Sequence, residues 1–280
     1  MTFLAPHPST VALLLADARL PGGGHAHSAS LEPALRGGMP PADVPAWMVG
    51  RATTVSLVEA GTAVVAARLL ADAGPWAPED RDAPPAGGPD GGVDLGADLG
   101  ADPGVDAVVR AWAARTPSPA LRDASRLLGR GYLRVARTLW PRSAAVRVLV
   151  RHDAASRRPA GLTTGTTSGT TTGTTTGTGT LPRAVVLGAI CAAAGMPPAD
   201  VVRLTVYDDA QTAASALLKL EPLDPLAPAR WVLDACAAAE EHVLRVAACA
   251  TPEDIPSSGA PLTEGWAEAH ALTTQRLFRA

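Results

Sequence analysis

The chain of 280 residues contains no asparagine, one lysine (Lys219) and two isoleucines (Ile190 and Ile255), and aromatic residues make up only 4% of it. Its apolar residues are therefore mainly Ala, Leu and Val, a mixture that favours helices over sheets. Hydrophobic residues make up 47% of the chain, enough to bury a substantial core. We predict an all-α protein with a single helical domain over residues 1–280, built of about eight to ten helices.

Other scarcities exclude whole classes of function. The net charge of -3 excludes a globally basic nucleic-acid-binding protein. The three cysteines, Cys191, Cys236 and Cys249, form no C-x-x-C pair, so we expect reduced, mostly buried thiols. No Lys or Arg precedes the first apolar run, which disfavours a signal peptide. The apolar run 184–196 has about 13 residues against the roughly 20 of a membrane helix, so we expect a cytoplasmic protein that does not contact membranes.

Two segments have a composition that does not fit a core. Residues 77–104 are rich in Pro, Gly and Asp and include the near-repeat GVDLGADLGADPGVD. Residues 161–180 contain twelve threonines and six glycines. Neither segment offers an apolar face that would offset the entropy lost on ordering. We predict disordered insertions at 77–104 and 154–180.

The remaining sequence predicts helices, with starts and ends marked by Pro, Gly, Asp and apolar periodicity. A Gly and a Pro close the apolar Ala-rich helix that ends near Ala194, and we expect this helix to be central and buried. The expected ranges are Val44–Ala73, Pro119–Leu139, Arg142–Asp153, Pro182–Ala194, Val201–Leu220, a long helix from Asp224 or Pro225 toward Cys249, and Glu264–Ala280.

A glycine-rich loop, LPGGGHAHSASLE, runs from Leu20 to Glu32. It has no G-K-[ST], no G-x-G-x-x-G and no preceding strand, so a tight turn is favoured over a nucleotide site. His25 and His27 stand two residues apart, and imidazole suits Ni, Cu or Zn. Two ligands make a weak site, so ordinary polar or packing roles are favoured and no resident metal or cofactor is expected.

No other pattern predicts catalytic residues. Asp208–Asp209 and Glu240–Glu241 are adjacent pairs, and neighbours on a helix diverge by about 100°, so we expect solvated faces instead of an acid–base pair. Arginines recur every four residues on one predicted helix, which favours a solvated or partner-facing surface; these are Arg122, Arg126, Arg130 and Arg134.

The carboxyl-terminal segment from His270 to Ala280 contains Phe278, one of only two phenylalanines, beside Arg276. An apolar anchor next to arginine is typical of an interface hot spot. The alternative is that Leu277 and Phe278 fold back onto their own domain.

The two ends of the chain together resemble the urease accessory protein UreF family. The amino-terminal signature of that family matches a set of residues around the glycine-rich loop: Leu20, Pro21, Gly23, Gly24, His25, His27, Ser28, Leu31 and Glu32. Its carboxyl-terminal signature matches His270, Arg276, Leu277 and Phe278. Between them, Gly129–Arg130, the 182–188 stretch and the end of the helix at 217–223 follow in the expected order.

The resemblance implies an all-helical, dimerising, non-enzymatic scaffold that helps to load nickel into apo-urease. It implies an adaptor between a UreD (UreH)-type protein and the UreG GTPase, with a partner-binding tail formed by His270, Arg276, Leu277 and Phe278. The motif loop would comprise Pro21, Gly23, Gly24, His27, Ser28 and Glu32. The alternative from another class is a small helical metal carrier or enzyme that uses His25, His27 and a cysteine.

Overall fold

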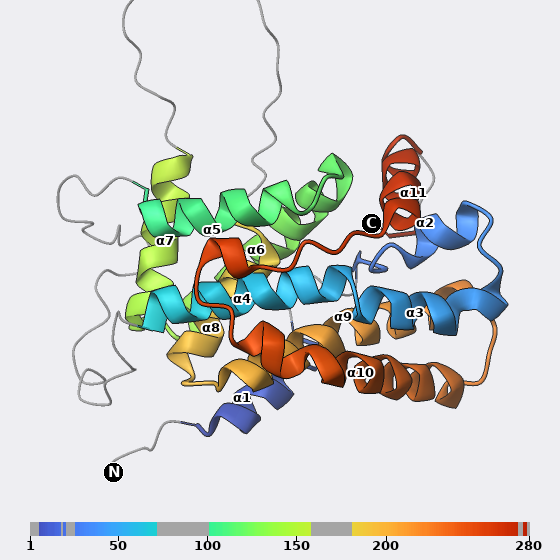
Figure 1. Cartoon of the computed structure of the whole chain (residues 1–280), viewed down its shortest axis with the longest axis horizontal. Coiled ribbons are helices and arrows are strands. Elements are labelled where there is room, and N and C mark those ends of the chain that lie inside the picture. Colours follow the sequence, from blue (N-terminus) through green and yellow to red (C-terminus); the bar gives the residue numbers. More distant parts are fainter. Residues whose placement is uncertain are drawn as a thin grey trace, which may run out of the picture.

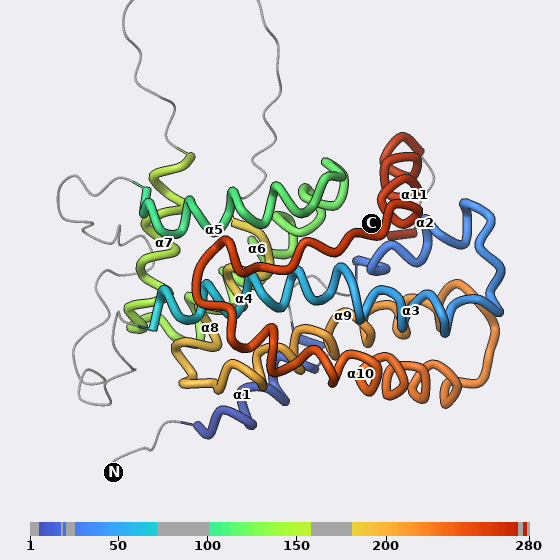
Figure 2. The backbone as a smooth tube through the Cα atoms, in the orientation of Figure 1, coloured from blue at the N-terminus to red at the C-terminus, as the bar shows by residue number. Residues whose placement is uncertain are grey.

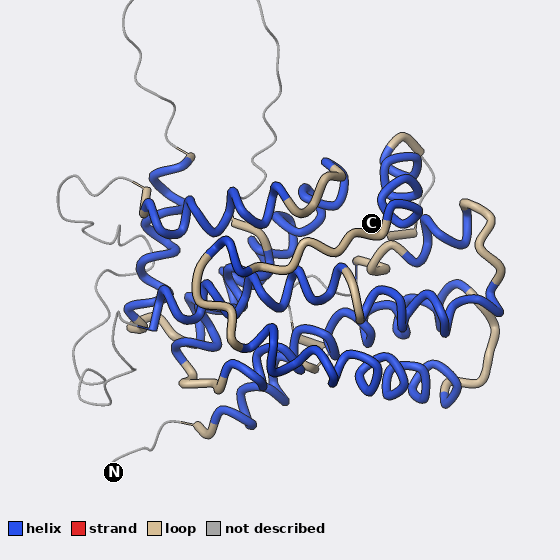
Figure 3. Tube along the Cα trace, in the orientation of Figure 1, coloured by secondary structure: helices blue, strands red, loops and turns tan. Residues whose placement is uncertain are grey.

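The computed structural model describes residues 6–17, 19–20, 26–71, 101–157, 181–273 and 277–278. Helices and loops account for all of this part and no strand occurs in it, which confirms the all-α prediction (Figures 1 and 3). The α-helices are α1 (Pro8–Leu15), α2 (Leu31–Arg36), α3 (Val44–Ala52), α4 (Val55–Ala71), α5 (Pro103–Ala114), α6 (Pro119–Leu139), α7 (Ala144–Ser156), α8 (Arg183–Ala193), α9 (Pro198–Leu220), α10 (Leu226–Ala247) and α11 (Pro261–Ala271).

Helix α8 is the centre of the core, as predicted. Every residue from Arg183 to Cys191 is buried, and α8 packs against α4, α6 and α7. Two glycines permit this close packing. A Cβ on Gly188 would lie 2.5 Å from the Ala63 carbonyl oxygen of α4, and a Cβ on Gly129 of α6 would collide with the Leu181 carbonyl group. These positions fall within the stretches on which the family resemblance rests.

Small polar side chains fix several helix starts. The side chains of Asp102, Ser118 and Ser143 accept the N–H of the residue three positions ahead, and so cap α5, α6 and α7. The carboxyl-terminal limit predicted for the insertion at 77–104 is wrong, because Asp102 caps α5 and this helix begins at Pro103. The insertion predicted at 154–180 is corrected likewise, because α7 continues to Ser156. Residues 72–100 and 158–180 lie outside the described part of the chain.

The predicted helix Val44–Ala73 is divided into α3 and α4 at Thr53 and Thr54. The Thr54 hydroxyl donates to the Gly50 carbonyl at 2.6 Å, and the Thr53 hydroxyl donates to the Val49 carbonyl at 3.0 Å. Threonine hydroxyls thus bind carbonyls of the last turn of α3, and the break falls at residues that are neither Gly nor Pro. The predicted helix Glu264–Ala280 is also shorter, since α11 begins at Pro261 and ends at Ala271.

The segment after α10 returns along the outside of the bundle and brings α11 beside α2 (Figure 2). It crosses α4 where Gly61 leaves room for Pro256, and Arg115, the residue after α5, donates to the Ile255 carbonyl at 2.7 Å. The two ends of the chain that carry the family signatures are therefore neighbours in the fold.

Residues Pro41–Ala71 form a stretch that is long and apolar enough to cross a membrane by length and composition alone. Within the fold, 61% of its most apolar window is buried. Packing inside the bundle accounts for the apolar character of this stretch.

Candidate functional site

The end of the glycine-rich loop leads into α2 through an uncommon backbone conformation. Ala29 and Ser30 both have positive φ, 50° and 69°, which is unfavourable for residues with a side chain. The Ser28 side chain accepts the Glu32 N–H at 3.2 Å and the Ser28 carbonyl accepts the Leu31 N–H at 2.9 Å. The strained turn is thus held by hydrogen bonds at its base, and it directs Glu32 into the protein.

Glu32 has no exposed surface and is the centre of the candidate site. Its two carboxylate oxygens accept the backbone N–H groups of Leu277 at 2.8 Å and Phe278 at 2.7 Å. Arg36, one turn later on α2, brings its guanidinium to 3.0 Å from the same carboxylate. His270 of α11 places Nε2 3.5 Å from it. One buried carboxylate therefore binds the two family signatures to each other.

Phe278 is held in this site by contacts on several sides. It is 3% exposed, its carbonyl oxygen lies 3.4 Å from His270 Nε2, and the Lys219 ammonium lies 5.3 Å from the centre of its ring. The ammonium at this distance gives a cation–π contact. Leu277, by contrast, is 60% exposed. The fold-back alternative is therefore realised for Phe278, while Leu277 faces solvent.

The structure brings together four of the residues singled out in the two signatures. Ser28, Glu32, His270 and Phe278 are buried in one region, and His27 is also buried. Pro21, Gly23, Gly24, His25 and Arg276 lie outside the described residues. The assignment of His270, Arg276, Leu277 and Phe278 to partner binding stays a prediction.

The described residues do not support a metal centre. No group of three or more His, Cys, Asp or Glu side chains among them is arranged to hold a metal ion. Cys191 and Cys249 are buried, and Cys236 is half-buried. Burial raises the pKa of the Cys191 thiol to about 12, so this thiol stays protonated and is a poor ligand or nucleophile at neutral pH.

The structure contains a buried cluster of charged side chains that was not predicted from the sequence. Asp208 and Asp209 diverge on α9 as expected, but both are largely buried, so the interpretation of a solvated face is wrong. Asp209 accepts two hydrogen bonds from Arg51, at 2.7 and 3.2 Å, and one from Ser56 at 2.7 Å. Asp208 pairs with Arg183 of the central helix. Glu240, of the other acidic pair, is exposed and pairs with Arg203 at the surface.

The cluster links α3, α4, α8 and α9. Burial and the paired arginines shift the pKa values of its carboxyl groups. Glu59 accepts the Trp112 indole N–H at 2.6 Å, and burial raises the pKa of this carboxyl group. Burial also raises the pKa of Asp208, although Arg183 opposes the shift. For Asp209, burial is outweighed by Arg51, and the pKa is lowered. The paired arginine thus keeps Asp209 ionised in the core.

Comparison with known proteins identifies the family. The UreF family model matches residues 40–236. A urease accessory protein UreF from Mycobacterium sp. (strain JLS) is 30% identical over 276 residues, which cover 96% of this chain and 97% of the relative. The protein of the same name from Mycobacterium marinum is 30% identical over 223 residues, 77% of each chain. The one from Mycobacterium tuberculosis H37Rv is 36% identical over 135 residues, 48% of this chain and 49% of the relative. The chain thus belongs to the UreF family of urease accessory proteins.

Proposed function

We propose that this protein is a cytoplasmic adaptor in urease maturation, linking a UreD (UreH)-type protein to the UreG-type GTPase so that nickel reaches apo-urease. In this role the chain carries out no reaction itself and acts as a homodimeric scaffold. The observation that carries the proposal is the site at Glu32. Two signature motifs of an accessory-protein family meet there, and they leave Leu277 exposed beside the buried, hydrogen-bonded Phe278.

This arrangement suits a contact surface better than a reaction centre. Both carboxylate oxygens of Glu32 already have partners, two backbone N–H groups and the Arg36 guanidinium, so the carboxylate has no room for a substrate. Glu32 holds the backbone of residues 277 and 278 in place before any partner arrives, which lowers the entropy cost of binding. The exposed Leu277 is then available to enter an apolar pocket of a partner.

No observation on the described residues favours the alternative of a metal carrier or enzyme based on His25, His27 and a cysteine. His27 and Cys191 are each buried, and burial keeps the Cys191 thiol protonated. We therefore retain the adaptor as the proposed function.

The experiment is co-expression of the chain with the UreD-type and UreG-type proteins and apo-urease. Co-purification and urease activity are compared for the wild type, Leu277→Ala and the control Leu244→Ala, which removes another exposed leucine from α10. We expect Leu277→Ala to reduce both signals and Leu244→Ala to leave them unchanged. Equal co-purification of all three forms would reject the tail as the contact, and absence of any complex with the wild type would reject the adaptor.

A further inference from the structure

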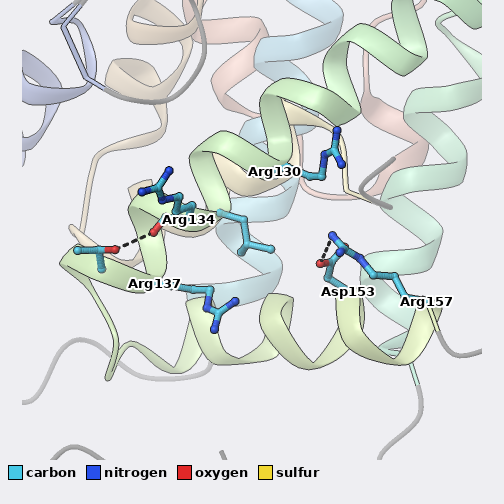
Figure 4. A pocket seen from close by; sticks show the side chains of 7 residues that line it. Arg130, Arg134, Arg137, Asp153 and Arg157 are labelled. Atoms are coloured by element: carbon cyan, nitrogen blue, oxygen red, sulfur yellow. Dashed lines mark hydrogen bonds and ion pairs between the residues drawn. The ribbon is translucent and has the colours of Figure 1, made fainter. Parts of the chain in front are cut away.

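A basic hollow lies between α6 and α7, away from the site at Glu32. It is open to solvent and has a volume of about 470 Å³, and its lining is Arg130, Leu133, Arg134, Arg137, Thr138, Asp153 and Arg157 (Figure 4). Four guanidinium groups and a single carboxylate give it a positive charge on a chain whose net charge is -3. Such a local reversal of charge attracts anionic ligands.

The arginines of α6 are presented along a rigid helix. Arg130, Arg134 and Arg137 share one face because they are four and three residues apart, and the rise of the helix spreads them over about 10 Å. Arg134 and Arg137 are exposed, and in the part of the chain that the structure describes no hydrogen bond or ion pair engages their guanidinium groups. These two side chains thus have donors available for a ligand.

The opposite wall is built differently. On α7, Asp153 is largely buried and holds Arg157 at 2.7 Å, while the Arg157 side chain remains 46% exposed. This ion pair neutralises one of the positive charges and fixes the direction of the Arg157 side chain. The hollow therefore has an ion pair at the end of α7 and open donors on α6.

The arrangement discriminates between classes of anion. Figure 4 shows the labelled guanidinium groups spread around the hollow and not converging on one point, as they would around a single phosphate group. No aromatic side chain is among the lining residues, so a nucleobase would have no stacking surface. An extended peptide places alternate side chains about 7 Å apart, so it can present more than one carboxylate along a row of arginines that spans about 10 Å.

We propose that this hollow binds an extended acidic segment of a partner protein, whose Glu or Asp carboxylates pair with Arg134 and Arg137. The planar fork of arginine suits such carboxylates because it donates two parallel hydrogen bonds to each. The proposal rests on the proposed function in one respect, that the chain acts by binding other proteins. It assigns a second contact surface, separate from the tail.

The test is fluorescence anisotropy with the full chain and a fluorescein-labelled peptide of alternating glutamate and alanine. Arg134→Ala/Arg137→Ala is compared with Arg110→Ala/Arg245→Ala, which removes the same charge from exposed positions on α5 and α10. We expect the first variant to weaken binding at least about tenfold and the second less than about twofold. A peptide with glutamine in place of glutamate should not bind.

Three results would overturn the proposal. The first is equal weakening by the two double variants, which would indicate attraction by overall charge only. The second is undiminished binding of the glutamine peptide. The third is binding of inorganic pyrophosphate or a single-stranded oligonucleotide as tightly as the glutamate peptide. Because the assay uses no urease component, its failure leaves the co-purification test of the adaptor unaffected, and the converse holds as well.

Discussion

The Glu32 carboxylate accepts the backbone N–H of Phe278 at 2.7 Å, although 246 residues separate the two. A buried carboxylate that accepts backbone N–H groups makes strong, charge-assisted hydrogen bonds. These bonds define the position of residues 277 and 278, and with it the exposure of Leu277. The first two predictions concern this relationship.

Phe278→Ala and Leu277→Ala form a matched pair of neighbouring substitutions. Phe278 is 3% exposed, so its truncation leaves a cavity, and we expect the free energy of unfolding to fall by about 3 kcal/mol. Leu277 is 60% exposed, and its truncation should change stability by less than about 0.5 kcal/mol. Urea denaturation followed by circular dichroism measures both. Equal effects would contradict the anchored tail.

Glu32→Ala should detach the tail. The substitution leaves the N–H groups of Leu277 and Phe278 without their acceptor, and each unsatisfied buried donor costs about 1–3 kcal/mol. We expect lower unfolding free energy together with faster amide hydrogen exchange at residues 277 and 278. Glu241→Ala, at an exposed position of α10, serves as the control and should leave exchange at the tail unchanged.

Gly188→Ala should loosen the contact between α8 and α4. A Cβ at this position would lie 2.5 Å from the Ala63 carbonyl oxygen, so the helices must separate, at a cost of about 1–3 kcal/mol. Gly50→Ala on α3 is the matched control because, beyond its own helix backbone and chain neighbours, no atom of the described residues lies within 4 Å of its added Cβ. There the higher helix propensity of alanine should raise stability by about 0.5–1 kcal/mol. The two melting temperatures should therefore move in opposite directions.

The buried carboxyl of Glu59 should make stability depend on pH. Its pKa is raised above the ordinary value of 4.5, so between these two values the folded state binds more protons than the unfolded state. The unfolding free energy contributed by Glu59 must then fall as the pH rises from 4.5 through the raised pKa. Glu59→Gln retains an acceptor for Trp112 but does not titrate.

The measurement is urea denaturation of the wild type and Glu59→Gln between about pH 4.5 and 7.5. The wild type should lose more stability than the variant over this range. The unfolding free energy of the variant should still fall somewhat as the pH rises, since the pKa of Asp208 is also raised. Parallel pH profiles for the two proteins would show that Glu59 does not titrate in this range.

Much of the fold could be predicted from the sequence because local signals mark it. The range Pro119–Leu139 is confirmed, and α8 ends within one residue of the predicted limit at Ala194. The break between α3 and α4 was not predicted because it falls at Thr53 and Thr54, and neither residue is Gly or Pro. Helix α5 was missed because its cap, Asp102, stands inside a near-repeat whose composition suggests disorder.

The sequence predicted which residues belong to the site but not how they contact one another. Sequence signatures selected Glu32 and Phe278, but nothing local indicates that they share a hydrogen bond. The burial of Asp208 and Asp209 was missed for a related reason. Their divergence on α9 follows from helix geometry, whereas the partners Arg183 and Arg51 are supplied by distant helices.

The distance in sequence between Glu32 and Phe278 also determines when the site can form in a cell. A ribosome must synthesise all of the intervening helices before the two N–H groups that Glu32 binds exist. A contact between residues so far apart in sequence requires the closure of a long loop. Contacts formed earlier in folding must first offset the entropy cost of this closure, so we expect the contact to form late. A chain terminated before residue 277 therefore retains the pair between Glu32 and Arg36 but lacks the two backbone N–H groups, so only chains translated through residue 278 form the complete hydrogen-bonded site.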